Sequence, residues 1–322
     1  MMRQIFLLLI LFSGIKISVA QQEPQFSQFM FNKVAFNPSF TGTDNALSTT
    51  FQFRNQWTGL NGHPVLQNFN IHTPLQKFNT GAGVIVMNDI SGALRNTNVM
   101  ISFCKRIPIK KSLLNFGLSG GILQSALDGE KLRAADGNYN GTINHNDNLL
   151  PTNSVNGIVP DISAGISFIS KKFETGISVN HMLGIAQKVS VNSLSLHSSN
   201  ERIFDFYTSK LFHVGRNFSF TPSVLLKSNL VNIQQEANAI LIYKKYFWVG
   251  AGYRGFTIKS KDALIGYLGI KLSENFKLGY SYDYNLSALS STNNGSHELL
   301  IIYQLKLVKP AIPGKVVFTP RN

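Results

Sequence analysis

The chain has 322 residues, of which only 14% are charged and 11% are aromatic. A soluble domain usually carries about 25% charged residues, so this composition is unusual for a protein whose whole surface faces water. The formal net charge is +14, which leaves nucleic acid, an anionic membrane surface and an acidic protein as partner classes. The one cysteine, Cys104, excludes an intramolecular disulfide and a cysteine-based zinc site.

Residues 1–20 have the order of a secretory signal peptide. The basic residue Arg3 precedes an apolar run over 5–12, and small residues lead to a cleavage site after Ala20. The run is much shorter than the roughly 20 apolar residues of a membrane-spanning helix, so we expect it to be removed on export. Export disfavours nucleic acid. Because the basic residues are spread along the strands, we expect contact with anionic outer-leaflet lipid or an acidic secreted partner.

Residues 21–45 precede the first predicted strand. The pattern i, i+3, i+4, i+7, i+8, which is typical of one face of a helix, is formed here by Phe26, Phe29, Met30, Lys33 and Val34. It stops at Asn37, because the residue before a proline, here Pro38, disfavours helical geometry. The spacing predicts a short helix before the strands.

Alternation of apolar and polar residues begins near residue 46 and recurs to residue 307. In the first such segment Leu47, Phe51 and Phe53 form one face, and Ser48 and Gln52 belong to the other. Turn signals divide the sequence into about fourteen segments of about 9–13 residues. We place these strands near 46–57, 65–73, 80–89, 95–107, 112–124, 160–170, 173–182, 200–213, 217–228, 231–243, 245–254, 261–273, 275–286 and 296–307.

These segments are longer than the strands of soluble sheets, which average about five or six residues. A tilted strand that crosses an outer membrane needs about 9–11 residues, and such barrels have an even number of strands with aromatic girdles. A soluble β-sandwich would alternate too, but with shorter strands and more outward charge. We therefore predict an all-β fold, a transmembrane antiparallel outer-membrane β-barrel over 46–307. Residues 21–45 form its plug or a periplasmic segment, and membrane lipid surrounds it.

Two further segments lie outside the strand pattern. Residues 125–159 are rich in asparagine and glycine and are predicted to be an exposed loop. Four of them match positions 1, 3, 5 and 12 of a calcium-binding loop, namely Asp136, Asn138, Asn140 and Asp147. Because only two of these are carboxylates, an ordinary asparagine- and glycine-rich turn is the favoured interpretation, and we expect no metal. Residues 308–322 contain three prolines and are predicted to be an extended tail.

No spacing of catalytic residues stands out. The histidines form no HExxH motif, and no nucleophile elbow, Walker loop or dinucleotide fingerprint occurs. His297 and Glu298 are neighbours on a predicted strand, so their side chains point to opposite faces. We therefore expect no enzyme activity, no cofactor and no small-molecule substrate.

Short motifs distributed over residues 23–307 form a recognisable set. The N-terminal ones comprise Pro24, Gln25, Phe26, Ser27, Gln28, Phe29, Met30, Phe31 and Asn32, followed by Asn37 and Pro38. The others cover 54–59, 62–64, 72–75, 160–162, 176–181, 222–227, 279–283 and 295–298. This set resembles the PorP/SprF family, outer-membrane proteins of the type IX secretion system and gliding machinery of Bacteroidetes.

The resemblance implies a barrel without catalytic residues that supports export or surface attachment of an adhesin-type cargo. Its implied partners are that cargo or other type IX secretion components. We predict that the N-terminal motif residues named above form the partner-binding element, with simple packing inside the barrel as the other interpretation.

Two other functions remain to be weighed. An outer-membrane channel or transporter for small hydrophobic molecules, with residues 21–45 as a hatch, would need an apolar pocket in the lumen. The predicted inward side chains are instead polar, namely Ser48, Gln52, Arg54, Gln56 and Asn115. A lipid-modifying enzyme would need a spaced nucleophile and base, which the sequence does not present.

Overall fold

The computed structural model describes residues 24–307 except 192–193, 200 and 258–259. The predicted signal peptide over 1–20 and the predicted tail over 308–322 lie outside the described residues. Within the part of the chain that is described, no helix is long and apolar enough to cross a membrane.

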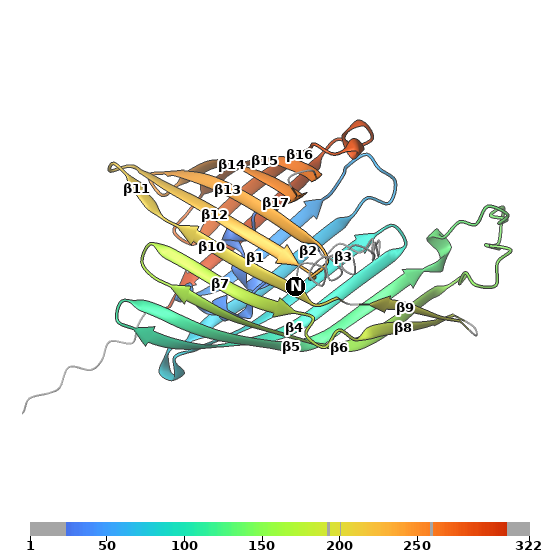
Figure 1. Ribbon diagram of the computed structural model, residues 1–322, viewed down its shortest axis with the longest axis horizontal. Helices are drawn as coiled ribbons and strands as arrows, with labels where there is room; N and C mark the ends of the chain where they lie inside the picture. The colour runs from blue at the N-terminus through green and yellow to red at the C-terminus, as the bar shows by residue number, and fades with distance from the viewer. Residues whose placement is uncertain (1–23, 192–193, 200, 258–259, 308–322) are drawn as a thin grey trace, which may run out of the picture.

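The strands form one closed antiparallel barrel (Figure 1). Its strands are β1 (Ala46–Asn55), β2 (Val65–Leu75), β3 (Thr80–Ser91), β4 (Leu94–Ile109), β5 (Ser112–Asp128), β6 (Ser154–Ile169), β7 (Phe173–Asn180), β10 (Ile203–Lys210), β11 (Phe212–Val214), β12 (Phe218–Ser228), β13 (Ile233–Tyr243), β14 (Phe247–Thr257), β15 (Ser260–Lys271), β16 (Phe276–Asn285) and β17 (Ser296–Lys306).

Two pairings complete the closure. The first and last strands pair, with Ala46 opposite Lys306, and β10 pairs with both β7 and β12. Only Leu211 separates β10 from β11, and both pair with β12, so together they act as one interrupted strand of the barrel wall. Counted in this way, the 15-stranded sheet forms a wall of 15 − 1 = 14 strands. The predicted antiparallel barrel of about fourteen strands is therefore confirmed.

The structure differs from the predicted segments at one end of the barrel. Strands β8 (Ala186–Val191) and β9 (Leu194–Ser199) form a separate hairpin that was not predicted from the sequence. Each has six residues, fewer than a membrane-crossing strand needs, so a search by spanning length passes over them. β5 and β6 extend further than predicted, and the loop between them is 129–153 rather than 125–159.

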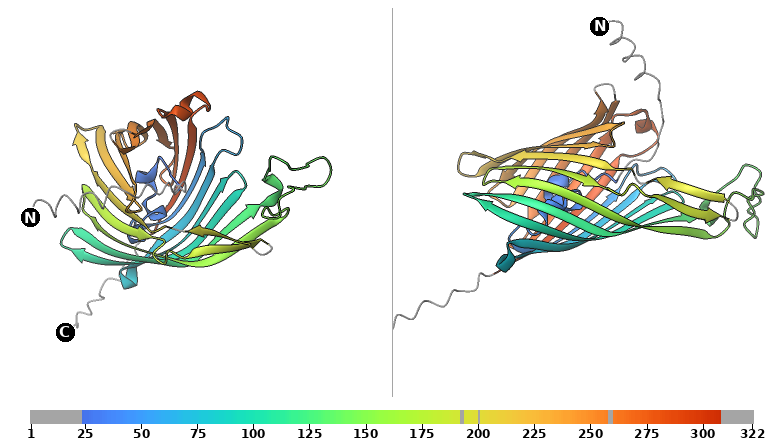
Figure 2. Two further views of the ribbon diagram at one scale, coloured as in Figure 1. Left: turned by 45° about the vertical axis from the view of Figure 1, so that its right-hand side comes forward. Right: turned by 60° about the horizontal axis from the view of Figure 1, so that its bottom comes forward.

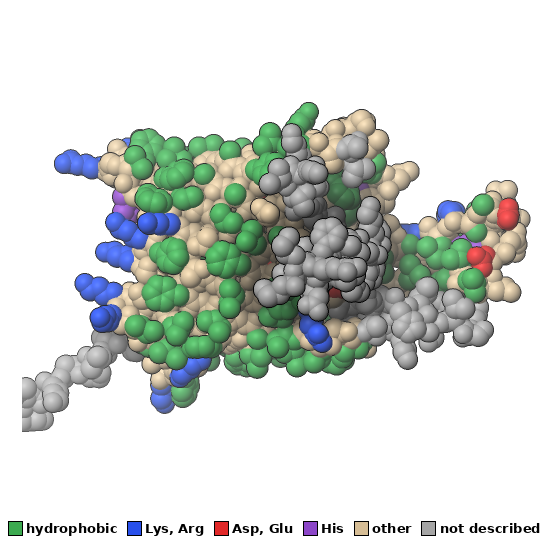
Figure 3. Space-filling view, in the orientation of Figure 1, with side chains coloured by type: hydrophobic (Ala, Val, Ile, Leu, Met, Phe, Trp, Pro, Cys, Tyr) green, Lys and Arg blue, Asp and Glu red, His purple; other side chains and the backbone are tan. Residues whose placement is uncertain are grey.

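The two faces of the barrel have opposite chemistry. Hydrophobic side chains cover the outer wall between the two rims (Figure 3), and Phe103 and Leu118 on this wall are each 58% exposed. The inner face is polar at the predicted positions: Ser48, Gln52 and Asn115 are fully buried. This arrangement matches a barrel whose outer wall contacts hydrocarbon.

The rims differ in the length of their connections. One rim, the short-turn rim, consists of 76–79, 110–111, 170–172, 215–217, 244–246 and 272–275. The opposite long-loop rim includes 56–64, 129–153, 181–202 and 286–295. In outer-membrane barrels short turns face the periplasm and longer loops face outside, and we assign the two rims accordingly.

The segment before β1 lies inside the barrel (Figure 2). We call residues 24–45 the plug. It contains three 3-10 turns, η1 (Phe29–Phe31), η2 (Lys33–Ala35) and η3 (Pro38–Phe40), whereas η4 (Gln76–Phe78), η5 (Gly129–Lys131) and η6 (Ala288–Ser291) belong to the connections. The predicted helix is wrong. Asn32 and Phe36 have extended φ angles of −132° and −121° that interrupt helical geometry, and apolar residues on every side of the plug meet a wall.

Candidate functional site

Ser27 connects the plug to a buried charge network near the long-loop rim. Its hydroxyl donates to the Asp283 carboxylate at 2.8 Å and accepts from Arg54 Nη1 at 2.8 Å and Arg254 Nη2 at 2.7 Å. Its backbone N–H donates to Glu298 Oε2 at 2.6 Å. One serine therefore joins side chains from β1, β14, β16 and β17.

The charges of this network are satisfied by one another rather than by solvent. Arg54 and Arg254 both donate to Asp283 Oδ2, at 2.7 and 2.8 Å, and Arg254 also donates to Glu236 at 2.6 Å. All four side chains are at most 5% exposed. Buried ions are stable only when paired, and removing one partner of such a group costs about 3–5 kcal/mol. The network therefore fixes the start of the plug against the wall.

Asn32 fixes the middle of the plug because both the nitrogen and the oxygen of its side-chain amide form hydrogen bonds. Its Nδ2 donates to Gln52 Oε1 at 2.5 Å and to Asn68 Oδ1 at 2.9 Å, and its Oδ1 accepts from Asn70 at 2.7 Å. These partners belong to β1 and β2. Because each bond is between buried groups, a substitution here would leave unsatisfied amides in the lumen.

Aromatic packing fixes the opposite side of the plug. The rings of Phe29, Phe36 and Phe40 surround Tyr207 of β10, with centroid separations of 6.1, 5.8 and 5.8 Å. Phe31 packs against Trp248 of β14 at 5.3 Å. The hydrophobic core of this protein thus lies within the lumen, between plug and wall.

Asn37 and Pro38 lie against a part of the barrel wall that is formed by glycine. Asn37 Oδ1 accepts the N–H of Ser39, which caps η3, while Nδ2 donates to the Ile177 carbonyl at 3.0 Å. A Cβ added to Gly117 would lie 2.2 Å from the backbone of Pro38. Glycine is therefore required at this wall position for the plug to approach so closely.

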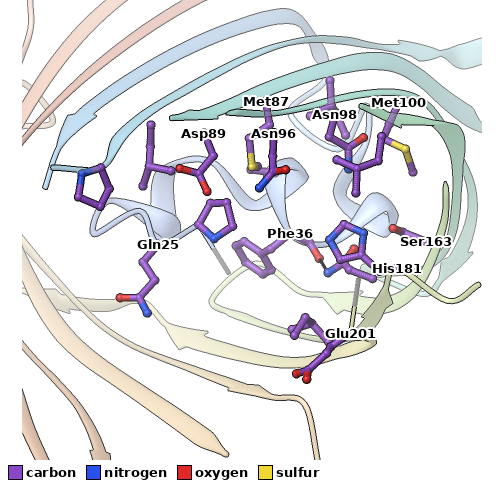
Figure 4. A pocket seen from close by; sticks show the side chains of 18 of the residues that line it. Gln25, Phe36, Met87, Asp89, Asn96, Asn98, Met100, Ser163, His181 and Glu201 are labelled. Atoms are coloured by element: carbon purple, nitrogen blue, oxygen red, sulfur yellow. Dashed lines mark hydrogen bonds between the residues drawn. The ribbon is translucent and has the colours of Figure 1, made fainter. Parts of the chain in front are cut away.

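A cavity of about 480 Å³ remains in the lumen between the plug and the long-loop rim. Figure 4 shows side chains from β3, β4 and β6, from the plug and from the chain around β7 and β10 arranged around it: Met87, Asp89, Asn96, Asn98, Met100, Ser163, Gln25, Phe36, His181 and Glu201. Its wall combines apolar side chains with amides and carboxylates. His181 is held there by Asp161, with 2.8 Å between Nδ1 and Oδ2.

The cavity brings several of the sequence motifs together. Pro24 and Gln25 of the plug, Gln56 and Trp57 after β1, and His181 after β7 all line it, although they are far apart in the sequence. Pro38 also lines the cavity and is buried. The remaining N-terminal residues singled out above pack within the lumen: Phe26, Ser27, Gln28, Phe29, Met30, Asn32 and Asn37 are buried, and Phe31 is partly buried.

Sequence reasoning missed the wall residues that receive the plug. Arg254, Glu236 and Tyr207 lie in predicted strands but belong to no singled-out site. Asp283 and Glu298 were noted only as parts of motifs. For the charged residues among them, the available signal was a charge at an inward position of a strand in a chain that contains few charges; Tyr207 carried no such signal.

The calcium-loop residues lie in the exposed 129–153 loop. Asn138 Oδ1 accepts the N–H of Asn140 at 3.1 Å, and Asp147 Oδ1 accepts the N–H of Leu149 at 2.8 Å. The Asp136 carbonyl accepts from Asn146 at 2.5 Å. Across the described residues, no three His, Cys, Asp or Glu side chains are grouped as a metal site. The expectation that this loop binds no metal stays a prediction.

Comparison with known proteins adds a family and a fold. The chain matches the family described as "Type IX secretion system membrane protein PorP/SprF" over residues 18–303. No curated protein is similar to it. The Ralstonia pickettii toluene transporter TbuX is 11% identical, with a TM-score of 0.51 over 88% of this chain and 94% of that chain. The monoaromatic hydrocarbon channel CymD is 11% identical, with a TM-score of 0.50 over 90% and 95%. These two similarities concern the fold alone.

Proposed function

Because the chain belongs to the PorP/SprF family of type IX secretion system membrane proteins, we propose that this outer-membrane barrel docks a secreted, adhesin-type cargo and supports its export or attachment to the cell surface. The role is that of a binding platform in the secretion and gliding machinery, without catalysis. The observation that carries the proposal is that several of the sequence motifs line one cavity, which lies between the plug and the long-loop rim.

The plug favours a platform over an open pore. It is hydrogen-bonded to β1 and β2 through Asn32, to β7 through Asn37 and to β16 and β17 through Ser27. A segment that is bonded to several sides of the lumen is rigid. A rigid plug narrows the aqueous channel between the two rims. Binding surfaces gain affinity from such preorganised parts.

The cavity supplies a recognition surface of mixed chemistry. Met87 and Met100 provide adaptable apolar contacts, and Asp89 and Asn96 beside them provide hydrogen-bond acceptors. A polypeptide segment that inserts one apolar side chain and one donor group would match both. Its position near the long-loop rim makes it accessible to a cargo that has already reached the outside.

The proposal is tested by capturing the tagged protein from native membranes. We expect the wild-type protein to recover a secreted adhesin or other type IX components. Met87→Trp, which fills the cavity, should lower this recovery severalfold, whereas Phe103→Trp on the lipid-facing wall should leave it unchanged. Recovery of no type IX component by the wild-type protein, or equal recovery by all three, would contradict the proposal.

A second candidate function has one observation in its favour. The inward residues of β1 are polar, as predicted, but the cavity also has an apolar wall that includes Leu66, Ile85 and Leu123. A channel or transporter for small hydrophobic molecules would use such a wall, with the plug as its hatch. Saturable uptake of a monoaromatic hydrocarbon into vesicles containing the barrel, abolished by Met87→Trp, would favour this function over docking.

A further inference from the structure

The short-turn rim carries a ring of exposed basic side chains. Figure 3 shows lysine and arginine side chains along this rim, on the side opposite the long loops. The ring consists of Lys77, Lys105, Lys110, Lys111, Lys171, Lys172, Lys210, Arg216, Lys244, Lys245 and Lys306, which we call the basic rim. The exposed basic residues of the described chain are thus concentrated at one end of the barrel, and for these the expectation of an even spread along the strands is wrong.

The opposite rim is nearly balanced in charge. Its exposed basic residues among those described are Arg95, Lys131, Arg133 and Arg202, and its exposed acidic residues are Glu130, Asp136 and Asp147. At the basic rim, the exposed acidic residues in the described chain are Asp44 and Glu274. Asp44 accepts hydrogen bonds from Ser48 and Gln304. Hydrogen bonds from Lys306 and Lys271 lower the pKa of Glu274 to about 2, so this carboxylate is ionised and paired while the other cations of the rim remain in excess.

Several lysines at this end of the barrel lie over aromatic rings of the strand ends and turns. Lys210 lies 5.1 Å from the ring centroid of Phe212, and Lys244 lies 5.2 Å from that of Tyr243. Lys77 and Lys271 make similar contacts at 5.7 Å with Phe78 and Tyr246. All four rings are between 37% and 61% exposed. Exposed aromatic rings next to lysine ammonium groups are typical of the level at which a bilayer changes from hydrocarbon to headgroup.

The basic rim follows the whole circumference. Basic residues occur in the turns after β2, β4, β6, β11 and β13, and at the end of β17. These strands are distributed around the closed sheet. A protein partner covers one sector of a rim, whereas lipid surrounds a barrel on every side.

We propose that the basic rim binds the phosphate headgroups of anionic phospholipid, such as phosphatidylglycerol, in the periplasmic leaflet of the membrane. Each lysine or arginine near such a surface is attracted to it, and the attraction declines within a Debye length. The lysines above the aromatic rings contact phosphates of the first lipid shell, and those at the turn tips add to the long-range attraction. The site selects headgroup charge and orients the barrel in the bilayer.

The test uses the purified barrel, with its plug, in nanodiscs that contain equimolar phosphatidylglycerol and phosphatidylethanolamine. Mass spectrometry measures the lipids that stay with the protein after detergent extraction. One variant carries Lys110→Gln, Lys111→Gln, Lys171→Gln and Lys172→Gln. A second, in another sector, carries Arg216→Gln, Lys244→Gln, Lys245→Gln and Lys306→Gln. The matched control removes the same charge from the long-loop rim with Arg95→Gln, Lys131→Gln, Arg133→Gln and Arg202→Gln.

We expect phosphatidylglycerol to be enriched on the wild-type protein, each rim variant to lose about half of this enrichment and the control to keep it. The heat-dependent gel mobility of each variant verifies that its barrel is folded. Enrichment that survives in both rim variants would overturn the proposal. Loss in only one sector would overturn it in favour of a localised partner, such as an acidic protein, and equal loss in the control would reduce it to an effect of net charge.

Discussion

Ser27 brings the plug into the charge network of the barrel wall through one hydroxyl and one backbone N–H. The hydroxyl is shared by two guanidinium groups and one carboxylate, all buried. The interaction joins residues that are 256 positions apart in the sequence. It exists only because the barrel is closed, since closure puts β16 and β17 beside β1.

Ser27→Ala should destabilise the folded barrel by about 2–3 kcal/mol, because it removes hydrogen bonds to charged groups and leaves buried donors without an acceptor. Urea unfolding in lipid vesicles, followed by tryptophan fluorescence, measures the change. Ser154→Ala at the exposed end of β6 is the control and should change the midpoint little. A Ser27→Ala midpoint equal to that of the wild type would show that the network does not need the plug.

The residues of the site could be predicted in part. The N-terminal motif identified Ser27, Asn32 and Asn37 as notable, and period-two alternation assigned Arg54 to the lumen, where it is buried. The partners of Ser27 across the barrel could not be predicted. Arg254 and Asp283 follow the same alternation as any inward residue, and no local spacing in the sequence states which of them meet.

The plug is an element held by packing as much as by hydrogen bonds. Its turn η3 lies directly against Gly117 of β5, and the neighbouring Cys104 of β4 donates its S–H to the Ser39 carbonyl at 3.1 Å. Cys104 is opposite Gly117 in the sheet register and is 1% exposed. The single cysteine of the chain therefore reports whether the plug is in place.

Gly117→Ala should loosen η3, because overpacking against a backbone costs about 1–3 kcal/mol. A shift of about 1.4 kcal/mol in the opening of the plug makes the thiol about tenfold more reactive. Labelling of Cys104 by a water-soluble maleimide measures this directly. Gly120→Ala on the same strand, where a Cβ meets nothing within 4 Å, should label as slowly as the wild type. Equal labelling of both variants would mean that the plug is not held at this point.

Removal of the plug tests its role in closing the lumen. Deletion of residues 24–42 takes away the turns η1 to η3 and should convert a barrel of low conductance into an open pore in planar bilayers. The control is the full chain with Phe103→Trp, which changes only the lipid-facing wall. A full chain that already conducts like the deletion variant would show that the plug does not close the barrel.

Among the elements of the fold, the strands were predicted better by sequence periodicity than the plug was. Strand alternation follows from two continuous environments, hydrocarbon outside and polar lumen inside, so each strand carries its own signal. The plug has no solvent face. Phe29, which belongs to the helical pattern, packs on a wall, and so do Phe31 and Phe36, which do not. The helical spacing of the apolar residues here therefore does not require a helix.

For the whole molecule, length and alternation were sufficient to predict a closed outer-membrane barrel. The distribution of charge was not recognised, although the doublets 110–111, 171–172 and 244–245 all lie in turns at one rim. In an up-and-down barrel, successive connections lie at opposite rims, so every second connection belongs to the same rim. Reading every second turn together would have located the basic rim.

Docking of cargo at the cavity between the plug and the long-loop rim, as we propose, can be measured by photo-crosslinking in intact cells. A photo-crosslinking amino acid is placed at Met87, within the cavity, or at Ile101, which is on the outer wall and 53% exposed. We expect a crosslink from position 87, and none from position 101, to a secreted adhesin or another type IX component. Crosslinks from position 101 alone, or to no such component from either position, would contradict it.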